Sequence, residues 1–408
     1  MPADHPLLHM VFTDTSGRDG DIHVGFIPGD KGDLAATDAA TGAPIHLCRY
    51  LDTHWYKLSD LPKGISISRF VGGRIYFCYG RPWEFERSGY EPSPAVSGDA
   101  NYFRRYDKME LTYTPIKWDV ADTTSFDYFS IPLALNSWRG GLAGTRVAAV
   151  TASTTDKVVP ALDALTNGAA HVKDPKTGAF VRVIGPGVYP PLPGRPISPY
   201  DNFESYFEYL QGSYAPAHGN VVARIEGWFG GVGEAPVTDP TRAQDYAFTA
   251  AIDAGLNITL TGAGTLIGER TIRLGRDALL APDGMYGSNP HFSIDGAKPA
   301  PPANDIYGWM VGDLLAGLNV GAVGSTVRLA GTAVGEMASQ DWFKLKEYFG
   351  ALQPKHPKNY NQWAATMSPL SQAYNFAYTD RFAHVVATLN PEPPVAVDTL
   401  EVVILPDK

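Results

Sequence analysis

Two acidic side chains, Glu110 and Asp127, have the type and spacing that hydrolysis of a glycosidic bond requires. They lie in two aromatic-rich segments, residues 106–113 and 124–132, which both have the composition of β-strands. Their separation of 17 residues allows a strand, a turn and a return to the same place on a sheet. Two carboxylates in one cleft are the minimum for this chemistry, because one protonates the leaving oxygen while the other activates water or attacks directly.

The local residue pattern predicts a strand around each acid. Alternation in residues 109–114 places Glu110, Thr112 and Thr114 on one face and the apolar side chains on the other. Asp127 lies in a similar alternating run. Acids are uncommon within strands of β-branched and aromatic residues, so each of the two is either solvated on an open sheet face or functional.

Other acids compete with Asp127 for the second role. Asp119 and Asp122 are predicted to lie in the turn between the two strands, where acids are common without function. Asp107 precedes Glu110 by three residues, so on a strand its side chain faces the other way.

A further group of acids lies beside aromatic residues. Glu84 and Glu86 alternate with Trp83 and Phe85, and together they could line a sugar subsite. The chain has 21 Tyr and 8 Trp, whose flat apolar faces and polar edges suit sugar binding. Most of these rings are expected in the core.

Sequence motifs for other chemistries are absent or do not fit. There is no G-x-S-x-G, Walker A, H-E-x-x-H or C-x-x-C motif, so no metal site or cofactor is predicted. Gly264 and Gly268 are separated by three residues where a dinucleotide fingerprint needs two, which favours a hairpin. The acidic loop at residues 14–21 does not match an EF-hand and is interpreted as a solvated turn. Cys48 and Cys78 could pair or remain buried free thiols.

Composition indicates a folded protein that does not bind polyanions. The 408 residues are 44% hydrophobic and 19% charged, with a net charge of −10. That charge argues against nucleic acid or an anionic membrane as the main partner, whereas a neutral polysaccharide imposes no charge requirement. The sequence contains no run of 18 apolar residues, so no transmembrane helix is predicted. The first residues do not resemble a signal peptide, which leaves the export route open.

The chain is predicted to contain two domains. Residues 1–140 are expected to form a β domain to which residues 374–408 return, and residues 141–373 to form a mixed α/β domain. The predicted β-strands of the first domain are 7–12, 22–27, 65–70, 74–79, 108–114 and 126–133, and a final strand is predicted at 397–405. The predicted helices are 155–167, one starting at Ser198-Pro199, 305–318 capped by Asn304, and 340–349.

Several segments resemble glycoside hydrolase family 64, the laminaripentaose-producing endo-β-1,3-glucanases, whose barrel is related to thaumatin. The order and spacing of the segments make the resemblance specific, and it covers most of the chain. The segments that carry it are residues 73–80, 106–114 with Glu110, 125–135 with Asp127, 305–319 and 374–380.

The resemblance implies a mechanism and a fold. Glu110 would be the general acid and Asp127 the general base of an inverting reaction, with their carboxyl groups about 6.5–9.5 Å apart. Apolar neighbours are expected to favour the protonated form of Glu110. The fold would be a thaumatin-like β-barrel or sandwich with an inserted mixed α/β domain and a wide groove between them.

The resemblance also implies glucan contacts just after the acid. Thr112, Thr114 and Trp118 stand in that stretch. The family often has Asn at the position of Thr114, so that contact would be altered, because threonine has one hydroxyl and no amide group. For Trp118, a place in the barrel core is an equally open alternative.

The predicted function is endo-acting hydrolysis of β-1,3-glucan of the laminarin or curdlan type, with release of short oligosaccharides such as laminaripentaose. The protein is expected to be a secreted monomer that uses no cofactor. One alternative is a non-catalytic thaumatin-like protein that binds β-glucan, and another is a hydrolase of a different polysaccharide.

Overall fold

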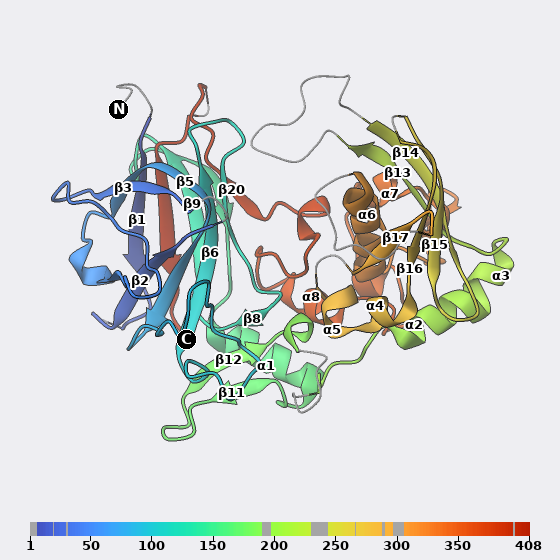
Figure 1. Cartoon of the computed structure of the whole chain (residues 1–408), viewed down its shortest axis with the longest axis horizontal. Coiled ribbons are helices and arrows are strands. Elements are labelled where there is room, and N and C mark those ends of the chain that lie inside the picture. The colour runs from blue at the N-terminus through green and yellow to red at the C-terminus, as the bar shows by residue number, and fades with distance from the viewer. Residues whose placement is uncertain are drawn as a thin grey trace. The chain divides into compact units, whose positions relative to one another are not determined.

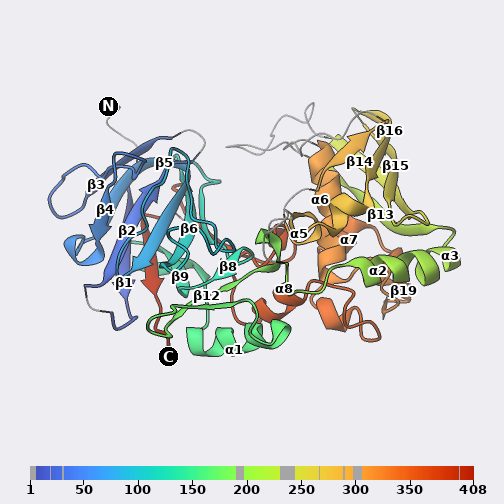
Figure 2. The same ribbon diagram turned by 60° about the horizontal axis from the view of Figure 1, so that its bottom comes forward.

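The structure, a computed structural model, describes residues 6–18, 20–29, 32–189, 197–229, 244–265, 267–287, 290–296, 306–394 and 396–408. These residues are mainly β, as predicted (Figures 1 and 2). The chain divides into two compact units. Unit 1 comprises Met1–Gly185, Met367–Asn375 and His384–Lys408, and unit 2 comprises Pro186–Thr366 and Phe376–Ala383.

Unit 1 is built around one large sheet. Its elements are β1 (Leu8–Asp14), β2 (Ile22–Ile27), β3 (Leu34–Asp38), β4 (Trp55–Lys57), the 3₁₀ helix η1 (Leu58–Asp60), β5 (Ile65–Tyr79), β6 (Arg105–Tyr113), β7 (Val120–Thr123), β8 (Tyr128–Phe129), β9 (Leu133–Arg139), β10 (Thr145–Val150), α1 (Thr155–Thr166), β11 (His171–Lys173), β12 (Phe180–Ile184), β20 (Val386–Thr388) and β21 (Thr399–Ile404).

The large sheet of unit 1 is a nearly closed barrel. Among the described residues it has eleven strands in the order β10-β9-β21-β1-β5-β6-β7-β20, with β2, β3 and β4 joined through β5 and β2. The end strands β10 and β20 contact each other, which brings the two edges of the sheet together. Strands β11, β12 and β8 form a separate small sheet.

The boundary of unit 1 differs from the predicted one at residue 140. Strand β10 extends the large sheet by pairing with β9, and β12 pairs with β8. Residues 141–185 therefore belong to the β unit. The final strand β21 returns to unit 1 and pairs in parallel with β1. Of the segment 374–408 that is predicted to return, Phe376–Ala383 belong to unit 2 instead.

Alternation along β5 and β6 decides which side chains fill the barrel. The inward residues of these two strands are fully buried: Ile75, Phe77, Met109, Leu111 and Tyr113. Each such side chain stabilises the fold by about 1.5–3 kcal/mol through burial. The residues between them project to the opposite, outward face, which carries the polar groups described below.

Two predicted strand assignments in unit 1 need correction. The segments 65–70 and 74–79 form one strand, β5, interrupted only by a β-bulge between Phe70 and Gly73. At the bulge Gly72 has a φ of +54°, a conformation that glycine adopts without steric cost. The segment 126–133 is not one strand, because β8 and β9 pair with different sheets on either side of Pro132.

An aromatic cluster covers part of the outward face of β5 and β6. Tyr76 and Tyr106 from these strands pack with the buried ring of Trp83 and with Tyr90. Both cysteines are buried in the same cluster and are free. The alternative of two buried free thiols is therefore the one that the structure shows.

Unit 2 combines a sheet with helices. Its elements are η2 (Pro186–Val188), α2 (Glu204–Tyr209), the π-helical turn η3 (Leu210–Tyr214), α3 (Ala215–Ala217), β13 (Val221–Phe229), β14 (Gln244–Ile252), β15 (Ile258–Gly264), β16 (Gly268–Leu274), α4 (Arg276–Leu280), α5 (Pro282–Met285), β17 (Phe292–Ile294), α6 (Ile306–Val320), β18 (Arg328–Leu329), β19 (Thr332–Ala333), η5 (Val334–Glu336), α7 (Ser339–Trp342), η6 (Phe349–Ala351), α8 (Gln362–Met367, whose last residue is assigned to unit 1) and η7 (Thr379–Arg381).

Strands β13 to β17 of unit 2 pair consecutively in an antiparallel sheet, and α6 packs against β13 (Figure 1). The pair β15–β16 forms a hairpin around Gly264 and Gly268, as the glycine spacing predicts. Helix α6 lies where a helix is predicted, although its predicted cap Asn304 and first residue Asp305 lie outside the described residues.

The other two helix predictions in unit 2 are wrong at their ends. Helix α2 begins at Glu204 rather than at Ser198-Pro199, and Asn202 Oδ1 accepts from its first backbone N–H at 3.1 Å. The helix predicted at 340–349 ends at Trp342, since Lys344 N bonds to the carbonyl of Asp341 in a tighter turn. No helix in the described parts of the chain has the length and apolar character to cross a membrane.

The end of the chain is fastened to unit 1 by Asp407. Its two carboxylate oxygens accept from Arg105 Nη1 at 2.8 Å and Nη2 at 2.5 Å, and Thr155 and Arg18 add further bonds. Burial opposes ionisation of Asp407, but the bonds to Arg105, Thr155 and Arg18 prevail and hold its pKa well below the ordinary value. The Arg105 side chain is 9% exposed, so Asp407 supplies the counter-charge for a nearly buried guanidinium.

Replacing this carboxylate tests the closure of unit 1. Asp407→Asn should destabilise the protein at neutral pH by about 1.5–3 kcal/mol, the usual value of hydrogen bonds to charged groups. A carboxylate whose pKa is lowered in the folded state contributes its full stabilisation only above its unfolded pKa, and it loses that contribution progressively at lower pH. The destabilisation by Asp407→Asn should therefore shrink as pH falls below about 4. Calorimetric melting from acid to neutral pH measures this, with the exposed Asp60→Asn as control. An equal loss at every pH would contradict the ion-pair explanation.

Candidate active site

Glu110 lies on the outward face of β6, in a row of side chains that crosses the sheet of unit 1. Its partners in the two neighbouring strands are Arg74 on β5 and Asp122 on β7. Residues opposite each other in an antiparallel pair project to the same face, with Cβ atoms about 4.5–5.5 Å apart. Glu110 therefore stands between a basic and an acidic neighbour.

The position of Asp122 corrects its sequence-based assignment to a turn, because it lies on β7. The turn is shorter than expected and is closed by Asp119, whose carboxylate accepts from Thr114 N at 2.6 Å and Ile116 N at 2.9 Å. Asp119 is thus a turn residue, as predicted. The strand resumes early enough for Asp122 to face the same side as Glu110.

A guanidinium contacts Glu110 where apolar neighbours were expected. Arg74 Nε donates to Glu110 Oε1 at 3.3 Å, and the Glu110 side chain is 41% exposed. Arg74 Nη1 also donates to Glu91 Oε1, and the hydroxyl of Tyr76 donates to Glu91 Oε2 at 2.7 Å. Arg74 is therefore shared between two carboxylates.

Asp127 lies in the bend before β8 rather than within a strand. Lys108 Nζ donates to its Oδ2 at 3.2 Å, and the Lys108 side chain is 10% exposed. Lys108 precedes Glu110 by two residues on β6 and therefore projects to the same face. The bend is anchored by Gly185, whose N–H bonds to the Asp127 carbonyl at 2.7 Å. A Cβ at Gly185 would meet the carbonyl of Phe126 at 2.2 Å, so this approach requires glycine.

Asp107 faces the opposite way, as predicted, and is buried. Its carboxylate accepts from the backbone N–H groups of Lys108, Ser130 and Ile131 at 2.9–3.0 Å. Burial raises the pKa of Asp107 to about 7, against the opposing effect of these bonds. Its contacts hold β6 to the segment that follows β8, so its role in the structure is to support the strand that carries Glu110.

The two threonines near Glu110 are both engaged by the protein. Thr112 Oγ1 accepts from the backbone N–H of Gly72 at 3.0 Å, across the β5 bulge. Thr114 lies just beyond β6, and its hydroxyl donates to Asp119 at 2.8 Å. Thr112 shares the face of Glu110 as predicted, whereas Thr114 belongs to the turn.

Trp118 does not cap the barrel core, since it is 47% exposed in the turn between β6 and β7. Lys117 Nζ lies 4.8 Å from the centroid of its ring. The alternative of a core tryptophan is therefore wrong. Its indole instead presents a flat apolar face and a polar edge to solvent in the turn that follows β6.

The acids at positions 84 and 86 do not form a sugar subsite with Trp83. Trp83 is 1% exposed and belongs to the aromatic cluster, so its ring faces cannot contact a ligand. Glu84 projects outward, with Arg81 at 3.8 Å, and Glu86 Oε1 accepts a long bond from Ala100 N at 3.4 Å.

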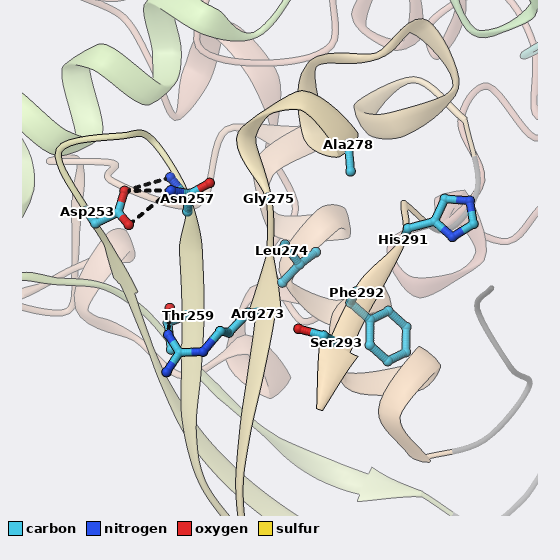
Figure 3. Close-up of a pocket in the computed structure, with 10 residues that line it drawn as sticks. All are labelled: Asp253, Asn257, Thr259, Arg273, Leu274, Gly275, Ala278, His291, Phe292 and Ser293. Atoms are coloured by element: carbon cyan, nitrogen blue, oxygen red, sulfur yellow. Dashed lines mark hydrogen bonds between the residues drawn. The ribbon is translucent and has the colours of Figure 1, made fainter. Parts of the chain in front are cut away.

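A separate pocket of about 410 Å³ lies in unit 2 (Figure 3). Among the described residues that line it, Asp253 supplies the one carboxylate, which accepts bonds from Asn257 and Gly255. Figure 3 shows Arg273 beside Thr259, and His291 on the far side of the pocket from Asp253. A single engaged carboxylate does not provide the two groups needed for glycoside hydrolysis.

The outward face around β6 gathers the groups that acid–base chemistry needs. It carries the carboxylates of Glu110 and Asp122 and the cation of Arg74. It also carries Lys108, whose ammonium contacts the carboxylate of Asp127. Carboxyl groups in such an arrangement can donate and accept protons at a bound substrate. Among the described residues, no group of three or more His, Cys, Asp or Glu is arranged to hold a metal ion.

Comparisons with known proteins agree with the motifs in the sequence. Residues 53–225, which include Glu110, Asp122 and Asp127, match the model of the glycoside hydrolase family 64, described as β-1,3-glucanase. A search of curated proteins found no match.

Two solved structures share the fold. One is a laminaripentaose-producing β-1,3-glucanase in complex with laminaritetraose, with 15% identity, a TM-score of 0.62 and 99% of each chain covered. The other is a β-1,3-glucanase domain of family 64 from Clostridium beijerinckii, with 13% identity, a TM-score of 0.57 and 99% of each chain covered. The resemblance to glycoside hydrolase family 64 is thereby confirmed, by a sequence match over residues 53–225 and by a fold shared along the chain.

Proposed function

We propose that this protein is a glycoside hydrolase that cleaves β-1,3-glucan of the laminarin or curdlan type. The observation that carries the proposal is the placement of Glu110 on the same sheet face as Lys108, whose ammonium holds Asp127. The match of residues 53–225 to a β-1,3-glucanase family supports the substrate class.

The contacts of the two acids support different roles for them. Asp127 is paired with the nearly buried ammonium of Lys108, and this charge-assisted contact holds its carboxylate in place for the role of general base. Arg74, the cation beside Glu110, is shared with Glu91, so it compensates Glu110 less completely. We therefore assign Glu110 as general acid and Asp127 as general base.

In the proposed reaction, Glu110 gives its proton to the glycosidic oxygen as the bond to the anomeric carbon breaks. Asp127 takes a proton from a water molecule that attacks this carbon from the opposite face of the sugar. The product has an inverted anomeric centre, and the two carboxyl groups must be about 6.5–9.5 Å apart to admit the water. Neither step requires a metal ion or a cofactor.

Asp122 is a second candidate for the base. It lies directly opposite Glu110 in the β6–β7 pair, and this geometry is independent of the Lys108–Asp127 contact. The two assignments differ in which aspartate must be neutralised to inactivate the enzyme, so mutation of each aspartate separates them.

The proposal extends to properties inferred from the family resemblance. The barrel of unit 1 would be of the thaumatin-like type, and unit 2 an inserted domain. The enzyme would be a secreted monomer that cuts glucan internally and releases short oligosaccharides such as laminaripentaose. A non-catalytic β-glucan-binding protein and a hydrolase of another polysaccharide are the alternatives.

Neutralising the proposed acids tests the mechanism. Glu110→Gln and Asp127→Asn should each lower kcat by about 10²–10⁴-fold, the usual contribution of general acid–base catalysis, while binding of glucan persists. Asp122→Asn should retain most activity, and Glu84→Gln serves as an exposed control. If Asp122→Asn is inactive and Asp127→Asn active, the base is Asp122.

Product analysis tests substrate and mode of cleavage. Linear β-1,3-glucan, chitin and cellulose are incubated with the protein, and we expect early products from the first alone, as oligosaccharides rather than glucose. Proton NMR of the nascent reducing ends should show the inverted anomer. Glucose as the initial product would contradict internal cleavage, and binding without any product would favour the non-catalytic alternative.

Trp118 provides a test of sugar stacking. Because its ring is exposed, Trp118→Ala should weaken binding of polymeric glucan by about 2–10-fold, the range expected for an aromatic contact, with little change in melting temperature. Phe103→Ala, another exposed aromatic residue of unit 1, is the matched control. An unchanged affinity would remove Trp118 from the binding surface.

A further inference from the structure

We propose that Glu91 is a positioning residue that allows Glu110 to act as a general acid by holding and partly neutralising Arg74. This inference rests on the proposed function and assigns a role to a residue that the sequence motifs did not single out. It is carried by the hydrogen bonds that connect Tyr76, Glu91, Arg74 and Glu110.

Arg74 poses a problem for an acid at position 110. A guanidinium within hydrogen-bond distance stabilises a carboxylate and opposes its protonation. A general acid must carry a proton at the working pH. If Arg74 had Glu110 as its sole partner, Glu110 would be held in the form that cannot donate.

Glu91 changes this balance because it takes the closer contact with Arg74. Nη1 of Arg74 bonds to Glu91, whereas only Nε reaches Glu110, at 3.3 Å. One cation thus serves two carboxylates. The negative charge of Glu91 therefore offsets part of the positive charge that Arg74 presents to Glu110.

Glu91 is itself held in place by a buried tyrosine. The hydroxyl of Tyr76 donates to Glu91 Oε2 at 2.7 Å, and the ring packs against Trp83 and Tyr106 in the aromatic cluster. Burial raises the pKa of Tyr76 well above its ordinary value, so the phenol remains a donor. Both oxygens of Glu91 therefore accept a hydrogen bond, one from Arg74 and one from Tyr76, which fixes the position of the carboxylate.

The charged groups around Glu110 come from three strands and two connecting segments on this face of the sheet. Arg74 comes from β5, Lys108 from β6, Asp122 from β7, Glu91 from the segment between β5 and β6, and Asp127 from the bend before β8. Lys108 is paired with Asp127. Glu91 is the acid that shares Arg74 with Glu110, so it is the group whose removal changes the field of Arg74 most directly.

The test compares pH profiles of kcat/KM for two neutral variants. The high-pH limb reports loss of the proton from the general acid. Glu91→Gln leaves Arg74 uncompensated, so this limb should move to lower pH by about 0.5–1 unit. Arg74→Gln removes the cation, so the same limb should move to higher pH. The low-pH limb, set by the base, should not move in Glu91→Gln.

Controls separate failure of this inference from failure of the proposed function. Glu84→Gln, an exposed acid of the same segment, should leave both limbs unchanged. If Glu110→Gln is inactive but neither variant moves the high-pH limb, Glu91 has only a structural role and the inference is overturned. If Glu110→Gln is fully active, the acid assignment fails, and with it the role of Glu91.

A readout that does not depend on activity completes the test. Carbodiimide reacts with protonated carboxyl groups, so labelling of Glu110 as a function of pH, measured by mass spectrometry, reports its titration directly. The labelling midpoint should fall in Glu91→Gln and rise in Arg74→Gln. Unchanged midpoints in folded variants, with melting temperatures close to that of the parent protein, would refute the proposal even if the protein has no glucanase activity.

Discussion

The antiparallel pairing of β5, β6 and β7 is the constraint on which the candidate site depends. It places Arg74, Glu110 and Asp122 opposite one another in successive strands. A slip of one residue would turn every one of these side chains to the other face and bring apolar residues into solvent. Burial of Met109, Leu111 and Tyr113 in the barrel therefore also fixes the direction in which Glu110 projects.

The bulge in β5 shows how closely register and chemistry are connected. It lies between Phe70 and Gly73, directly before Arg74, and Thr112 stabilises it by accepting from Gly72. An added Cβ at Gly73 would lie 1.9 Å from the ring of Phe70, so the core itself requires glycine there. The resulting register brings the guanidinium of Arg74 to Glu110 rather than to a neighbour along the strand.

Electrostatic pairing then distinguishes carboxylates that the fold has brought to one face. Lys108, nearly buried, has Asp127 as its partner, while Arg74 is shared by Glu91 and Glu110. Environments that stabilise the charge of one carboxylate more than that of another are how enzymes separate an acid from a base. Asp107, on the opposite face of the same strand, is buried and supports the segment after β8 through its backbone contacts.

The sequence by itself determined what depends on local pattern: the mainly β character, the alternation around Glu110, the inward direction of Asp107, the turn role of Asp119 and the resemblance to family 64. It also singled out Asp127, although not the bend in which Asp127 lies.

The tertiary structure decided what depends on contacts between distant segments. In the structure Asp122 lies on β7 rather than in a turn, and Glu110 contacts Arg74 rather than the apolar neighbours that were expected. Trp118 is exposed and Trp83 is buried. Glu91 could not be recognised from the sequence, because its role arises from a loop that folds back onto β5 to reach Arg74 and Tyr76. Periodicity records which face a side chain takes along its own strand, but the register between strands and the return of loops are set by packing across the whole barrel.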